Sequence, residues 1–175
     1  MSLSLNKYTK NTVGYDFLNK FTYRDVSKLP ALLSIKLTFN IKNYNFKNLL
    51  ISLAALEIIS LNKCFLIKSK TSVLSLKIRK GSPIGCTVTL RKNKQFRFIL
   101  LLLNKYTINK QSSTPSTSGL VFNTNISNVI ALPELENNYH FFKELNNLSF
   151  SIFTSAKTES ELYYLLKSYK ISLQT

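Results

Sequence analysis

The segment from Lys77 to Arg91, KIRKGSPIGCTVTLR, gathers side chains that could bind an anion. Apolar residues alternate with basic and hydroxyl-bearing residues over 74–79 and again over 86–91. Because successive strand residues face opposite ways, this pattern predicts a hairpin with one apolar face and one basic, hydroxyl-rich face. Glycine and proline in 80–85 predict the turn between the two strands. The polar face needs an anionic partner or bulk water.

Side chains for catalysis are scarce. The chain has no phosphate-binding GxxxxGK[ST], no GxSxG and no GxGxxG motif. His140 is the single histidine and lies among aromatic residues, where a packing or interface role is more common than catalysis. Glu134 and Glu136 follow a proline, which is more typical of a helix start than of a catalytic carboxylate pair. We therefore predict that the protein is not an enzyme.

Metal binding is also unsupported. Cys64 and Cys86 are the only cysteines, without a CxxC motif, whereas a metal site needs three or four grouped ligands. A disulfide is possible, but two thiols are more often small buried hydrophobic residues in a reducing compartment. We predict no metal and no cofactor.

The distribution of charge is more informative than the net charge of +16. Residues 58–133 contain no acid but carry twelve of the 24 Lys and Arg, whereas the segments before and after sum to about +5 and −1. A cationic region of this kind indicates a phosphate-bearing partner, either nucleic acid or anionic lipid, and the alternative is a solvated surface with excess lysine. Lipid binding calls for a basic amphipathic helix, but these charges lie on expected strands and turns, so RNA is favoured.

The rest of the chain predicts one packed domain over 1–175. Hydrophobic residues make up 45% of the sequence, which is enough for a core. The apolar runs 49–59 and 99–103 are shorter than the roughly 20 residues of a membrane span, and the N-terminus has no signal or transit pattern. We expect a soluble protein made where it works, with no membrane partner.

Periodicity predicts an α+β fold, with an antiparallel sheet of about five strands and helices packed on one face. Asn11 is the expected cap of the first helix, and Thr158-x-x-Glu161 is a capping box for the last one. Residues 107–119 are polar and predict a flexible loop. The expected strands are 33–41, 64–68, 122–132 and 148–153 with the hairpin above, and the expected helices are 11–21, 46–60, 95–104 and the one that follows Thr158. For 95–104 the alternative is a buried strand, and a helix is favoured because a strand has just ended at Arg91.

KIRKGSPIGCTVTLR resembles the signature of the large-subunit ribosomal protein L-five family (universal uL5), which is associated with 5S rRNA. The resemblance extends to FLNKFTYRDVSKLPALLSIKL near the start, to ALPELENN, and to SFSIFTSAKTESELYYLLKSY near the end. These stretches cover most of the chain in the family's order. The rival class is a free-standing RNA-binding regulator with the same fold.

The resemblance implies a structural role in the central protuberance of the large subunit. It implies contacts with large-subunit rRNA, with 5S rRNA where that is retained, with tRNA in the peptidyl site, with neighbouring proteins of the protuberance, and with the small-subunit head. It implies that rRNA contacts fall at Thr38, Asn62, Lys63, Thr89 and Arg91. A projecting basic loop over 68–85 is expected to contact tRNA through Lys68, Lys70, Lys77, Arg79, Lys80, Gly81 and Ser82.

Departures from the family pattern also carry information. The family's Gly-Gln-Lys-Pro turn is replaced by Leu61–Cys64, and its glycine- and arginine-rich central segment is replaced by 107–119. Abundant Asn, Lys, Ile, Leu, Phe and Tyr indicate an AT-rich genome. Because we see no transit segment, we expect an organelle-encoded protein of the mitochondrial ribosome, in the matrix, with the cytoplasm of an AT-rich bacterium as the alternative.

Overall fold

The computed structural model describes residues 7–23, 25–40, 46–74, 78–105, 108–109, 113–116, 119–143, 145, 147–171 and 173–174. The helical elements are η1 (Thr9–Val13), α2 (Gly14–Lys20), η2 (Val26–Lys28), α3 (Phe46–Ser60), α4 (Asn93–Lys105), η4 (Val129–Ala131), α5 (Pro133–Glu136), α6 (Tyr139–Phe142) and α7 (Glu159–Ser168). The strands are β1 (Leu32–Asn40), β2 (Phe65–Lys68), β3 (Pro83–Leu90), β4 (Ile108–Asn109), β5 (Ser113–Ser116), β6 (Gly119–Ile126), β7 (Leu148–Thr154) and β8 (Leu173–Gln174).

The α+β fold class is confirmed. Six strands form one sheet in the order β2-β3-β1-β7-β6-β5, and β4 and β8 form a separate parallel pair. The edge pairs β2–β3 and β5–β6 are antiparallel. The sixth strand, β5, is short and comes from the segment 107–119. The flexibility that we expect of that segment stays a prediction, because much of it lies outside the described residues.

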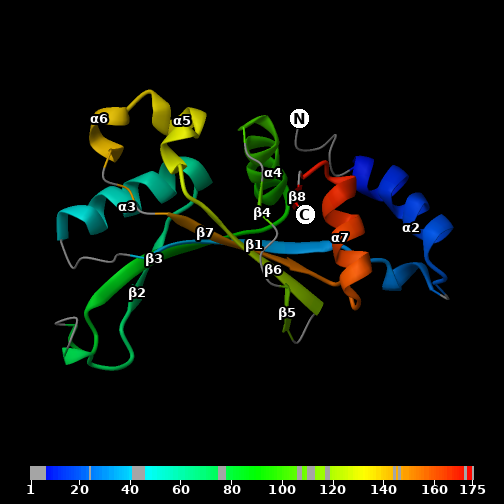
Figure 1. Ribbon diagram of the computed structural model, residues 1–175, viewed down its shortest axis with the longest axis horizontal. Coiled ribbons are helices and arrows are strands. Elements are labelled where there is room, and N and C mark those ends of the chain that lie inside the picture. Colours follow the sequence, from blue (N-terminus) through cyan, green and yellow to red (C-terminus); the bar gives the residue numbers. More distant parts are fainter. Residues whose placement is uncertain are drawn as a thin grey trace. The chain divides into compact units, whose positions relative to one another are not determined.

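The chain forms two compact units, whose boundaries fall inside β1, β3, β6 and β7. Unit 2 comprises Lys36–Thr89 and Asn125–Phe150. In this unit α3 packs against α5 and α6, and these helices lie on the same side of β1 and β3 (Figure 1). Apolar residues on alternate positions of β1 and β3 point into this core: Leu37, Phe39, Cys86 and Val88. The opposite faces of these strands have no described helix over them.

Unit 1 comprises Met1–Ile35, Leu90–Thr124 and Ser151–Thr175. Its α7 is held against the N-terminal segment, where the rings of Phe17 and Tyr164 meet edge to face at 5.0 Å and Tyr23 Oη donates to Glu161 Oε1 at 2.8 Å. The capping box is confirmed. Thr158 Oγ1 accepts from Glu161 N at 3.4 Å, while Glu161 Oε2 accepts from Thr158 N at 3.2 Å.

Two local expectations were wrong. Asn11 does not cap the first helix, because it lies inside the π-helical turn η1, which already begins at Thr9. The strand expected over 122–132 ends at Ile126 and is followed by the 3₁₀ turn η4. There Val129, Leu132 and Leu135 are buried, so the apolar residues continue the core through turns and helices rather than through a strand.

Candidate nucleic-acid interface

The basic hairpin is built from β2 and β3. Phe65 lies opposite Thr87 and Leu66 opposite Cys86, in antiparallel register. The hairpin expected between 74–79 and 86–91 was therefore wrong in its first strand. Val73 and Ile78 form only an isolated bridge, and residues 75–77 lie outside the described part of the chain. The second strand was right, and Cys86, Val88 and Leu90 are buried as the alternation predicts.

The predicted turn residues 83–85 belong to β3 instead. Gly85 is needed there for a close approach, because a Cβ atom would lie 2.4 Å from the Phe39 carbonyl oxygen of β1. Gly81, with φ +87°, does lie in a turn, and a Cβ atom on it would meet nothing within 4 Å. One glycine of the motif therefore serves strand packing and the other serves backbone conformation.

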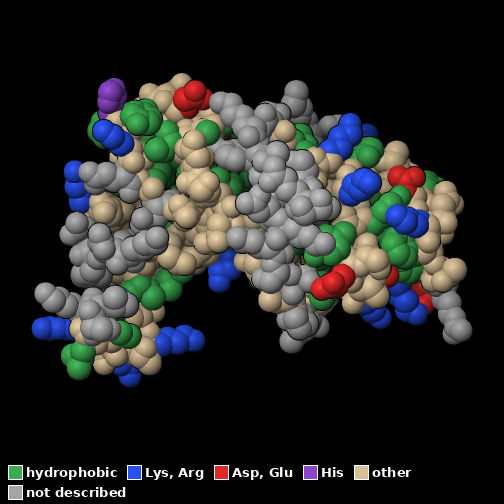
Figure 2. Space-filling model, in the orientation of Figure 1, with side chains coloured by type: hydrophobic (Ala, Val, Ile, Leu, Met, Phe, Trp, Pro, Cys, Tyr) green, Lys and Arg blue, Asp and Glu red, His purple; other side chains and the backbone are tan. Residues whose placement is uncertain are grey.

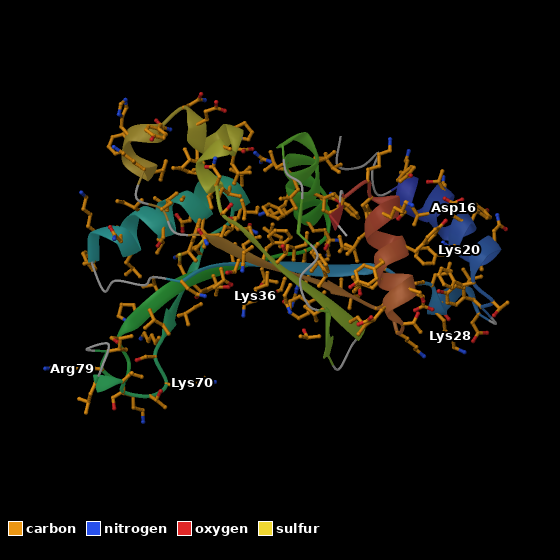
Figure 3. The ribbon with its side chains drawn as sticks, viewed as in Figure 1. Asp16, Lys20, Lys28, Lys36, Lys70 and Arg79 are labelled. Carbon is orange, nitrogen blue, oxygen red and sulfur yellow. The ribbon has the colours of Figure 1, made fainter. Side chains whose placement is uncertain are left out.

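The outward face of unit 2 carries hydroxyls and a cation. Thr87 Oγ1 donates to the Leu37 carbonyl oxygen at 3.0 Å and lies 3.4 Å from Thr38 Oγ1. Lys36 is exposed on β1 and points away from α3, to the side without a described helix (Figure 3). Thr89 is exposed farther along β3. Two of the expected rRNA-binding residues, Thr38 and Thr89, thus lie on this one face.

Asn62 and Lys63 lie in the turn between α3 and β2. Leu61 adopts φ +50°, so this turn reaches the left-handed region without a glycine. Asn62 N donates to Ser60 Oγ at 3.2 Å, and the Glu57 carboxylate accepts from Cys64 N at 3.1 Å. These bonds hold the turn, leaving Asn62 half-buried and Lys63 exposed. Arg91, also exposed, follows β3 in unit 1.

The loop between β2 and β3, residues 69–82, is closed by hydrogen bonds at its base. The Arg79 carbonyl oxygen accepts from both Ser69 Oγ and Ser82 Oγ at 2.6 Å, and Ser69 N donates to Ser82 O at 2.9 Å. Farther out, Val73 and Ile78 exchange two backbone hydrogen bonds. The loop therefore has its own internal structure beyond a tight base.

Cations line this loop. Lys68 ends β2, and Lys70, Arg79 and Lys80 are exposed, whereas Lys77 lies outside the described residues. Arg79 and Lys70 point outward from opposite sides (Figure 3). Figure 2 shows blue side chains around this lobe at the lower left and no red ones. The loop thus presents positive charge in several directions, which suits a curved or grooved polyanion.

The two cysteines and the histidine form no metal site with other residues of the described chain. Cys64 and Cys86 are free and buried, and burial raises the pKa of the Cys64 thiol to about 11 and raises that of Cys86 as well. Both thiols are therefore protonated near neutral pH and behave as small hydrophobic residues. His140 is exposed on α6. Within the described chain no three His, Cys, Asp or Glu residues come close enough to hold a metal ion.

Sequence reasoning missed Phe65. Its side chain is 70% exposed and, since it lies opposite Thr87, it projects from the outward face of the hairpin. The register of β2 against β3 was the missing information, because the short run FLIK has no clear apolar alternation.

None of the described helices is both long and apolar enough to cross a bilayer.

The fold and this site define an α+β protein with a cationic hairpin that is suited to contacting a polyanion. No protein-family model matches the sequence. Curated relatives match it over nearly its whole length. Large ribosomal subunit protein uL5m of Reclinomonas americana is 31% identical, covering 97% of each chain. The uL5 proteins of Nitrosomonas europaea and Blochmanniella floridana are 30% and 29% identical, covering 95% and 97% of this chain and 96% and 92% of their own.

The chain therefore belongs to the uL5 family of large ribosomal subunit proteins. The resemblance inferred from the sequence motifs is confirmed. This membership also confirms that the protein is a structural component of ribosomes and not an enzyme.

Proposed function

We propose that the protein binds rRNA in the central protuberance of the large ribosomal subunit, with 5S rRNA among its partners where that RNA is retained. The observation that carries this proposal is the outward face of β1 and β3. There Thr38, Thr87 and Thr89 offer hydroxyls, and no acidic residue occurs in β1, β2 or β3. Structured RNA is recognised largely through phosphates and 2′-hydroxyls, which hydroxyl and cationic side chains can bind. Asn62 and Lys63, in the turn before β2, and Arg91, directly after β3, are further proposed contacts.

The loop 68–85 has a separate role in this proposal, which is contact with tRNA in the peptidyl site. Its cations are exposed on more than one side, and its base is tied by the two serine hydroxyls on the Arg79 carbonyl. A loop with an ordered base holds its cations at a defined distance from the sheet. The other proposed partners are neighbouring proteins of the protuberance and the small-subunit head. In this proposal residues 1–175 act together as one RNA-binding domain.

We further propose that this is a mitochondrial ribosome, in the matrix, and that the protein is organelle-encoded. Two observations support this. The amino-acid composition, rich in Asn, Lys, Ile, Leu, Phe and Tyr, indicates an AT-rich coding genome, and the relatives include the uL5m protein of Reclinomonas americana. Fractionation of source cells with an antibody tests it. The protein is expected in the mitochondrial fraction, and its recovery with bacterial-type cytoplasmic ribosomes would overturn the assignment.

Cosedimentation and crosslinking test the proposed binding to rRNA. In sucrose gradients at moderate salt, the protein is expected in the large-subunit peak, and crosslinking is expected to recover rRNA. A protein that is absent from that peak, or that crosslinks chiefly to messenger RNA outside ribosomes, would instead be a free-standing RNA-binding regulator.

A further inference from the structure

Phe65 occupies an unusual place for an exposed aromatic residue. It opens β2, an edge strand of the sheet, and 70% of its side chain is exposed. In the described chain its ring stacks on no other aromatic ring. Leaving a phenylalanine ring in water forgoes about 1.5–3 kcal/mol of burial free energy. A single exposed hydrophobic residue is common on protein surfaces, so the side chains around Phe65 decide what it can bind.

The surroundings of Phe65 are polar and cationic. Directly across the hairpin lies Thr87, whose hydroxyl is oriented by its bond to the Leu37 carbonyl and adjoins Thr38. Lys63 lies two residues before Phe65, at the end of the hairpin away from the loop, and is exposed. Leu61 and Leu66 are also exposed, by 57% and 44%, but Leu66 lies opposite the buried Cys86 and so faces away from the Phe65 ring. On its own face the ring stands beside hydroxyls, with the cation of Lys63 two residues away in the chain. That combination fits RNA, since bases stack on the ring while phosphates and sugars meet Lys and Thr.

We propose that Phe65 is a stacking platform for one unpaired nucleobase of the bound RNA. This inference rests on the proposed rRNA-binding function and adds a feature of the RNA, which must present an unstacked base beside the backbone held by Thr38, Thr87 and Lys63. Stacking on a phenylalanine requires only the π face of the base, so the contact supplies affinity without selecting a base.

The chain contains no tryptophan, which permits a direct test. Phe65→Trp gives a protein with a single tryptophan at the proposed platform, and stacking of a base on an indole quenches its fluorescence. Phe46→Trp and Phe141→Trp are matched controls, because Phe46 and Phe141 are 71% and 72% exposed, which is close to the exposure of Phe65. Phe46 lies on α3 and Phe141 on α6, so neither belongs to the hairpin. The three proteins are titrated with RNA extracted from purified large ribosomal subunits, and with inorganic polyphosphate as a probe that has charge but no bases.

We expect RNA to quench the tryptophan fluorescence of the Phe65→Trp protein strongly and that of the two control proteins little. We expect polyphosphate to quench none of the three. In mobility-shift assays Phe65→Ala is expected to raise Kd by about 5- to 150-fold, Phe65→Leu to behave similarly, and Phe65→Tyr to bind as the native protein does. RNA binding of normal affinity with equal fluorescence changes in all three tryptophan proteins would overturn the stacking role and leave the proposed function standing. Failure of the native protein to bind the RNA would overturn both. Quenching by the RNA-free ribosomal protein fraction instead would identify Phe65 as a protein contact and overturn the proposal.

Discussion

Replacing Gly85 by alanine is expected to destabilise the protein more than replacing Gly81, although both glycines lie in the same KGSPIGC motif. The added methyl at Gly85 would lie 2.4 Å from the Phe39 carbonyl oxygen, whereas ordinary contacts begin at 3.4 Å. Strands β1 and β3 must therefore move apart locally by about 1 Å. A backbone hydrogen bond near 2.9 Å would then exceed the usual distance limit and be lost.

The size of the effect follows from these displacements. One or two ladder hydrogen bonds contribute about 1 kcal/mol each, and overpacking a well-packed site costs about 1–3 kcal/mol. Alanine restricts the unfolded chain and recovers about 0.4–1 kcal/mol. The net loss in the free energy of unfolding is therefore about 1–5 kcal/mol. At Gly81 the methyl meets open space, and only the positive φ of +87° is strained, so the net cost is about 1 kcal/mol or less.

Urea denaturation followed by circular dichroism measures both changes. With a urea dependence of about 2–3 kcal/mol per molar, the Gly85→Ala midpoint is expected to fall by roughly 1 M and the Gly81→Ala midpoint by less than half of that. Gly85→Ala is also expected to weaken rRNA binding, because it separates the strands that hold Thr38 and Thr87. Equal midpoints for the two variants would refute the close-approach reasoning.

Two further predictions concern α7 and the division of RNA contacts. Desolvation acts to raise the pKa of Glu161, but hydrogen bonds from neighbouring backbone amides and a tyrosine hydroxyl outweigh it and lower the pKa below 4.5. A depressed pKa means that folding favours the carboxylate, so its stabilisation is full above pH 4.5 and is lost as the pH falls through the folded-state pKa. Glu161→Gln is therefore expected to be less stable than the native protein at pH 7, with a gap in urea midpoint that narrows below pH 4.5; a gap that is constant with pH would count against this. The double variant Arg79→Gln/Lys80→Gln is expected to impair tRNA binding to assembled ribosomes more than it impairs cosedimentation with the large subunit. The double variant Thr89→Val/Arg91→Gln is expected to impair cosedimentation more than tRNA binding. Equal assembly defects in the two double variants would show that the loop and the strand residues do not have separate roles.

Much of the fold could be predicted because local patterns were strong. The helix over 46–60 has the bounds expected for it, although its apolar residues surround it, because the run is long and is bounded by polar residues. In β7, Leu148, Phe150 and Ile152 alternate as expected, and α7 begins directly after Thr158. Each of these features depends on residues within a few positions of one another.

The candidate site could be predicted only in part. The outward position of Thr89 followed from alternation with Val88 and Leu90, which are buried. The strand that pairs with β3 could not be predicted from the sequence. Residues 73–78 and 65–68 have similar apolar content, and strand pairing depends on contacts between residues far apart in the chain. Phe65 was missed for the same reason, since its face is defined only by lying opposite Thr87.

The sequence by itself determined the charge distribution, the alternation of β1 and β3, the capping box and the motif that indicates the family, because these are properties of residue types at short spacing. Only the tertiary structure decided that Gly85 serves the approach of β3 to β1, that the Arg79 carbonyl ties the base of the loop, and that Phe65 joins Thr38 and Thr87 on one face. Those arrangements arise when strands far apart in the chain pair in one register. A shift of that register by one residue would turn the same side chains to the other face of the sheet.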